Sequence, residues 1–110
     1  MQLDATLTAL SDPTRRAILL RLAEGEATVA ELAAPHDLTQ PTISKHLKVL
    51  EAAGLIETRP DANRRPRRLV PGALRELSDW VEQFRRIWEG RFDNLDDFLR
   101  TEPPSKGQGR

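Results

Sequence analysis

The sequence predicts a mainly α-helical protein of about five helices with one small β-hairpin. Three observations support this fold class. Two helix-start signals, Asp12-Pro13 and a Thr-x-x-Glu box at Thr28, each precede a run of apolar residues. A longer amphipathic segment follows from Thr39 to Gly54. After it, two short runs of β-forming residues flank a polar turn from Pro60 to Pro66.

The size of the chain, 110 residues, suits a single domain. We expect residues 1–100 to form that domain, and residues 101–110, which lack apolar side chains, to be a disordered tail. No apolar run approaches the ~20 residues that span a bilayer. The first residues also lack the basic and apolar regions of a signal peptide. We therefore expect a cytoplasmic protein that does not associate with membranes.

The charge of the chain is zero overall but unevenly distributed. From Thr39 to Arg68 there are seven lysines and arginines against three acidic residues. A basic region of this kind favours binding to nucleic acid, despite the neutral total. The chain has no cysteine, which excludes disulfides, thiolate metal sites and cysteine nucleophiles.

The first two predicted helices lie before Gly25. Leu3, Leu7 and Leu10 are spaced as one stripe of a short helix. The Asp12-Pro13 pair then provides an N-cap residue and a proline at the first helical position, where a missing N–H costs nothing. A second helix is therefore predicted to begin there and to end at Gly25.

The next two predicted helices form a helix-turn-helix. A capping box that starts at Thr28 begins a helix of about two turns, which Pro35 closes. Thr39 then caps a longer helix from Gln40 to Ala53, and Gly54 follows as its C′ residue. A short helix, a tight turn and a longer helix are typical of this motif.

The segment after the longer helix is predicted to be a wing, a β-hairpin with strands at residues 55–59 and 67–70. The motif and the hairpin together predict a winged helix-turn-helix. Guanidinium groups on such a hairpin can bind phosphates or enter the minor groove of DNA. The arginines are Arg64, Arg65, Arg67 and Arg68.

The longer helix is amphipathic. At about 100° per residue, Ile43, Leu47 and Leu50 form a narrow apolar stripe, and Lys45 and Lys48 point away from it. Two lysines on a helix face are commonplace and by themselves indicate only a solvated surface. Beside a basic wing, however, a face of short polar and basic side chains suits the major groove.

The segment from Ala73 to Leu99 returns to a helical period and contains both tryptophans and all three phenylalanines. That is more apolar surface than a small domain needs from its last helix, so we expect a homodimer. The alternative is a helix that bends near Gly90, or at Asp93-Asn94, and folds back onto its own core. The predicted dimer interface comprises Leu3, Leu7, Leu74, Leu77, Val81, Phe84 and Trp88.

The motifs resemble those of the ArsR-type repressors over about residues 3 to 99. Asp12–Leu19 reads D-P-T-R-R-x-I-L, and Ser44–Ile56 reads S-K-H-L-x-x-L-x-x-A-G-L-I. The resemblance implies a homodimeric winged helix that binds operator DNA and represses transcription until a signal, such as a small-molecule or protein effector, relieves it. It also implies that Gln40, Thr42, Ser44 and Lys45 face bases, and that His46, Lys48 and the wing arginines Arg64, Arg65 and Arg67 lie near the DNA backbone.

Metal sensing, which this family is known for, is not expected here. The thiolate sensors carry a Cys-x-Cys pair after Glu-Leu, whereas Glu31-Leu32 is followed by Ala33-Ala34. The zinc-type site on the last helix needs histidines, and none follows His46. We therefore expect the branch without metal ligands and no cofactor.

The sequence also bears on two other functions. The chain shows no Ser-His-Asp set, glycine-rich phosphate loop or nucleophile elbow, so an enzyme is not expected. A winged-helix module that binds a protein instead of DNA, through Trp80, Trp88 and Phe92, remains the alternative.

Overall fold

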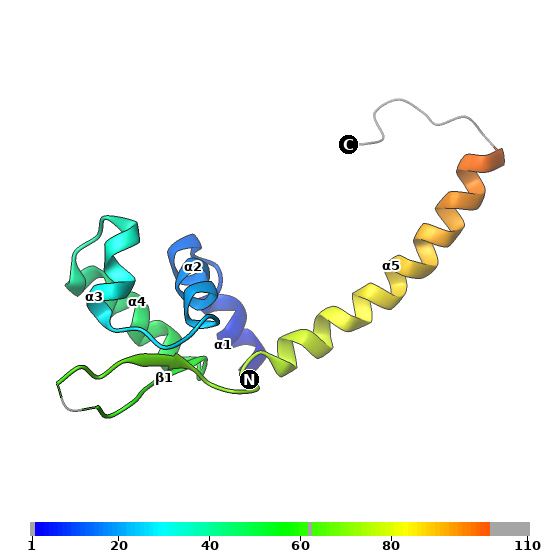
Figure 1. Cartoon of the computed structure of the whole chain (residues 1–110). Helices are drawn as coiled ribbons and strands as arrows, with labels where there is room; N and C mark the ends of the chain where they lie inside the picture. Colours follow the sequence, from blue (N-terminus) through cyan, green and yellow to red (C-terminus); the bar gives the residue numbers. More distant parts are fainter. Residues whose placement is uncertain (1, 62, 102–110) are drawn as a thin grey trace. The chain divides into compact units, whose positions relative to one another are not determined.

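The computed structural model describes residues 2–61 and 63–101, with side chains up to residue 90 (Figure 1). Apart from Thr101, the predicted tail lies outside the described residues. The chain divides into two compact units, residues 1–77 and residues 78–110, each of which is considered by itself. The prediction of one domain over residues 1–100 therefore stays a prediction.

The elements confirm the predicted winged helix-turn-helix. In chain order they are α1 (Gln2–Ala9), α2 (Pro13–Leu22), α3 (Val29–Ala33), the 3₁₀ helix η1 (Ala34–His36), α4 (Gln40–Ala52), β1 (Ile56–Thr58), β2 (Arg67–Leu69) and α5 (Arg75–Thr101). The motif consists of α3, η1 and α4, and the wing consists of β1 and β2 with the turn between them.

The core of the first unit holds α4 in place. Its predicted apolar stripe, Ile43, Leu47 and Leu50, is at most 1% exposed and packs with Ile18 of α2 and Leu32 of α3. Burying an aliphatic side chain of this size stabilises the fold by about 1.5–3 kcal/mol. The apolar face of α4 is therefore fixed inward, which leaves its polar face outward.

The turn of the motif differs slightly from expectation. The Thr28 capping box is present, but only five residues of the predicted two turns are α-helical and the rest form η1. Pro35 lies inside η1, where it lacks the N–H that an α-helix would use. Asp37 then adopts a φ of 54°, which ends the turn before α4.

The wing is an antiparallel pair with Ile56 opposite Leu69 and Thr58 opposite Arg67. Both strands are shorter than predicted, with three residues each. On its other side, the backbone of Arg67 exchanges hydrogen bonds of 2.8 and 3.0 Å with Ala27. β2 is thus flanked on one side by β1 and on the other by the backbone of Ala27.

The start of α5 is later than predicted. Ala73 and Arg75 donate backbone hydrogen bonds to Val70 and Gly72, and Gly72 has a φ of 76°. Because this turn occupies the first residues of the predicted helix, α5 begins at Arg75 instead of Ala73.

The described part of the second unit, from Ser78 onward, belongs to α5, which is helical from Arg75 through Gly90 without interruption. Its described part carries an aromatic ladder: the rings of Trp80 and Phe84 lie 5.0 Å apart, and those of Phe84 and Trp88 lie 6.2 Å apart. Arg85 and Glu82, which are not part of this ladder, form an ion pair with a distance of 2.7 Å. No described helix is both long and apolar enough to cross a membrane.

Candidate nucleic-acid interface

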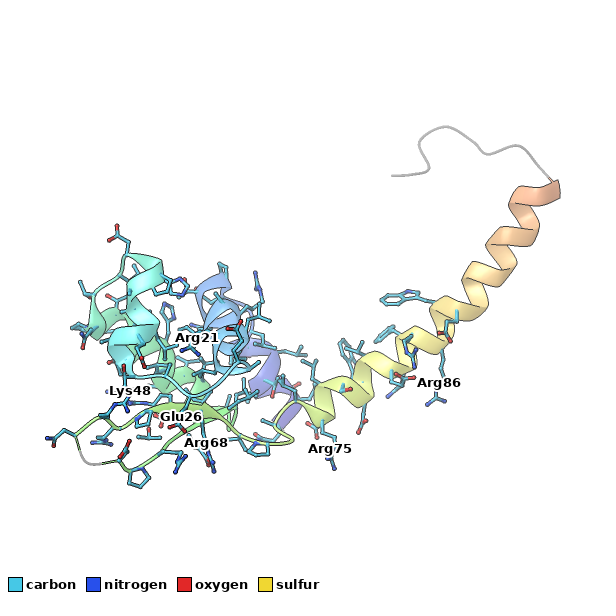
Figure 2. The ribbon with its side chains drawn as sticks, viewed as in Figure 1. Arg21, Glu26, Lys48, Arg68, Arg75 and Arg86 are labelled. Carbon is cyan, nitrogen blue, oxygen red and sulfur yellow. The ribbon has the colours of Figure 1, made fainter. Side chains whose placement is uncertain are left out.

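The outward face of α4 is polar and basic. Gln40, Thr42, Lys45 and Lys48 are exposed, and Figure 2 labels Lys48. The hydroxyl oxygen of Thr39 accepts the backbone N–H of Thr42 at 3.3 Å and lies 3.0 Å from the hydroxyl of Thr42. This cap fixes the first turn of the helix, from which the side chains predicted to read bases project.

The other two predicted residues of α4, Ser44 and His46, are only partly exposed. The His46 side chain is 20% exposed, and its Nδ1 lies 3.3 Å from Nη1 of Arg15 and 3.9 Å from the carboxylate of Asp12. The pKa of Asp12 lies below its ordinary value, chiefly because this carboxylate accepts the backbone N–H of Arg15. His46 therefore faces the first turn of α2 and not the outward face of α4.

The wing arginines fall into two groups. Arg68, labelled in Figure 2, pairs with Glu57 on the facing strand. Arg67 is partly buried, and its Nη1 donates to the carbonyl of Arg65 at 2.6 Å. Among the described residues, the exposed guanidinium groups of Arg64 and Arg65 take part in no ion pair. These two, at the tip of the wing, are the ones available for phosphates.

Two ion pairs of the wing were not predicted from the sequence. Arg59 pairs with Glu26 at 3.0 Å, and Arg68 pairs with Glu57. The second pair joins residues on facing strands, so a correct strand register would have revealed it. The first pair spans 33 residues and has no local signal. The contact of Arg15 with His46 is likewise long-range and was missed.

The predicted interface residues lie in different environments. Leu3 and Leu77 are partly buried, and Leu74 packs against the core of the first unit. The more exposed members are Leu7 of α1 and three residues of α5, namely Val81, Phe84 and Trp88. On α5, Trp88 is 51% exposed in the single chain.

The histidines of the chain lie on different elements, His36 on η1 and His46 on α4. Among the residues that the structure describes, no group of three or more histidine, aspartate or glutamate residues could hold a metal ion.

Known proteins that are similar to this chain include transcriptional regulators. A family model described as a helix-turn-helix domain matches residues 10–59. An HTH-type transcriptional regulator of Mycobacterium tuberculosis is 43% identical over 81 residues, which is 74% of this chain and 76% of that protein. A biofilm growth-associated repressor of Agrobacterium fabrum is 45% identical over 56 residues, which is 51% of this chain and 48% of that protein.

Solved structures extend the likeness beyond the motif. The crystal structure of an ArsR family transcriptional regulator matches with a TM-score of 0.72 and 38% identity over 81% of this chain and 98% of that one. A homodimeric winged helix-turn-helix DNA-binding domain from Mycobacterium bovis matches with a TM-score of 0.64 and 25% identity over 94% and 87% of the two chains. On this likeness in sequence and fold, the chain belongs to the ArsR family of winged helix-turn-helix transcriptional regulators.

Proposed function

We propose that this regulator is a cytoplasmic repressor, and not an enzyme, that binds operator DNA as a homodimer and needs no metal ion. One observation carries the proposal. Within one unit, the exposed face of α4 and the guanidinium groups of Arg64 and Arg65, which form no ion pair among the described residues, supply groups for base edges and for phosphates.

The dimensions of α4 suit the major groove. Its 13 residues make a helix of about 20 Å, and the groove, about 12 Å wide, admits one α-helix. Gln40, Thr42 and Lys45 then reach base edges from the first turns. Lys48, Arg64 and Arg65 contact the phosphate backbone.

The dimer rests on the apolar surface of α5. Five large apolar side chains lie within nine residues, each at least 38% exposed: Trp80, Val81, Phe84, Ile87 and Trp88. An apolar surface of this kind marks a protein interface. A two-fold dimer through α5 would present two recognition helices about 34 Å apart, one turn of DNA. The effector that relieves repression stays a prediction.

The test begins by selecting duplexes from random-sequence DNA with the full chain. We expect an enriched sequence with two half-sites. Affinity for it should fall steeply with salt. The logarithm of the binding constant should fall with the logarithm of the salt concentration, with a slope of about −0.9 for each phosphate neutralised. Lys45→Ala should weaken this binding by roughly tenfold, the loss of about one base contact.

Glu24→Ala, a change at an exposed residue in the turn after α2, provides the control. Failure to enrich any sequence would remove the proposal. A monomer that captures one heterologous protein and ignores DNA would support the protein-binding alternative instead.

A further inference from the structure

The side chain of Arg15 connects α1, α2 and α4. Its Nε donates to the carbonyl of Ala9 at 2.7 Å, and Nη2 donates to the carbonyl of Thr8 at 3.4 Å. Both carbonyls belong to the last turn of α1. The remaining nitrogen, Nη1, lies 3.3 Å from Nδ1 of His46 in the middle of α4. One guanidinium group, held on the first turn of α2, thus contacts both neighbouring helices.

This contact favours one tautomer of the His46 ring. A guanidinium group can only donate hydrogen bonds, and it keeps its proton in proteins. Nδ1 of His46 can accept a hydrogen bond from this group only in the tautomer that carries its proton on Nε2. The Asp12 carboxylate, the other charged group beside the ring, is 3.9 Å from Nδ1 and itself accepts the backbone N–H of Arg15.

Arg15 both caps the end of α1 and contacts α4, whereas the neighbouring Arg16 only caps α1. Its Nη1 donates to the carbonyl of Leu10 at 2.8 Å, just beyond the end of α1. Carbonyls at a helix end have no partner within the helix, and cationic side chains stabilise them. Arg16 performs this capping without a hydrogen bond to α4. What distinguishes Arg15 is its contact with His46.

We propose that Arg15 is a positioning residue for sequence-specific DNA binding, a role that rests on the proposed function. It holds α4 against the end of α1 and keeps His46 in the Nε2-protonated tautomer. Lys45 is adjacent to His46 and Thr42 is one turn before it, so a small rotation of α4 would move both. Base contacts require placement within about 0.5 Å, whereas binding to phosphates alone tolerates such movement.

The binding test compares Arg15→Lys with Arg16→Lys. Both changes keep the charge and shorten a side chain that caps α1. Only the first change removes a contact with α4. The probes are the duplex selected with the wild-type chain and a scrambled duplex of the same composition. We expect Arg15→Lys to weaken binding to the selected duplex by roughly tenfold, as for one hydrogen bond to a charged group. Binding to the scrambled duplex should change by less than about twofold, because the charge is kept.

A second pair of variants isolates the acceptor on His46. His46→Asn retains an oxygen near the position of Nδ1, whereas His46→Leu retains bulk without an acceptor. Both lack Nε2, so any direct contact that Nε2 makes with DNA is lost equally. We expect His46→Asn to bind the selected duplex roughly tenfold more tightly than His46→Leu.

The tautomer is measured independently from the ¹⁵N shifts of the two ring nitrogens in the wild-type chain. The chain has two histidines, so a His36→Asn sample assigns the signals. A proton on Nδ1 of His46, or equal losses in Arg15→Lys and Arg16→Lys, would overturn the positioning role even if the variants fold poorly. If the wild-type chain selects no duplex, the proposed function fails instead, and the tautomer measurement still tests the contact.

Discussion

The hydroxyl of Thr58 donates a 2.6 Å hydrogen bond to the carboxylate of Glu51. Thr58 is the last residue of β1, and Glu51 lies in the last turn of α4. The bond therefore joins the recognition helix to the first strand of the wing. Between them the chain reverses at Gly54, whose φ of 77° suits glycine.

Removing this bond should destabilise the first unit. Thr58→Val keeps the shape of the side chain but leaves the partly buried Glu51 carboxylate without its donor. We expect the free energy of unfolding to fall by about 1 kcal/mol, measured by urea denaturation. Thr58→Ser, which keeps the hydroxyl, should lose less than half as much. Equal losses in the two variants would show that the hydrogen bond contributes nothing.

The arginines at the tip of the wing should contribute more to DNA affinity than the paired arginine on β2. Arg64→Gln and Arg65→Gln should each weaken binding and reduce the salt slope by about 1, the effect of one phosphate contact. Arg68→Gln is the matched control, because its guanidinium already pairs with Glu57. Salt titrations of binding measure all three. A larger slope change for Arg68→Gln than for the other two would contradict the assignment.

A charge within the aromatic ladder of α5 should break the homodimer. Phe84→Asp would place a carboxylate between Trp80 and Trp88, and burying it unpaired at an interface costs several kcal/mol. We expect a monomer by light scattering and much weaker binding to the selected duplex. Gln83→Asp adds the same charge about 100° away around the helix and should leave the dimer intact. A dimer in both variants would place the interface elsewhere.

The capping box of α3 should make stability depend on pH. The pKa of Glu31 lies below its ordinary value of 4.5 because its carboxylate accepts the backbone N–H and hydroxyl of Thr28, with smaller effects from the charges of Arg64 and Arg21. A carboxyl with a depressed folded-state pKa stabilises the fold above its unfolded value. That contribution disappears as the pH falls through the folded-state pKa.

Thermal melting of the wild-type chain between about pH 6 and about pH 3 measures this loss. Glu31→Gln keeps an acceptor for Thr28 but cannot ionise, so its melting temperature should fall less over that interval. Parallel curves for the two proteins would mean that the ionisation of Glu31 is not coupled to folding.

Local signals predicted the starts of α2, α3 and α4 correctly, whereas α2 was expected to end at Gly25 and ends at Leu22. Asp12 and Thr39 cap α2 and α4 as expected, since a cap depends on a side chain and a backbone N–H only two or three residues away. The strands were predicted too long, and α5 was predicted to start too early. Their ends depend on partners such as Ala27 and on the turn at Gly72, which the pattern of apolar residues does not reveal.

For this chain, the sequence alone determined the fold class, the inward stripe of α4 and the outward position of Lys45 and Lys48, because a helical period assigns each residue to a face. The tertiary structure decided which basic groups are paired. Arg68 pairs with Glu57 across the hairpin, and His46 is turned toward Arg15, 31 residues earlier in the chain. Such pairings depend on how the elements pack in space, which the order of residues along the chain does not show.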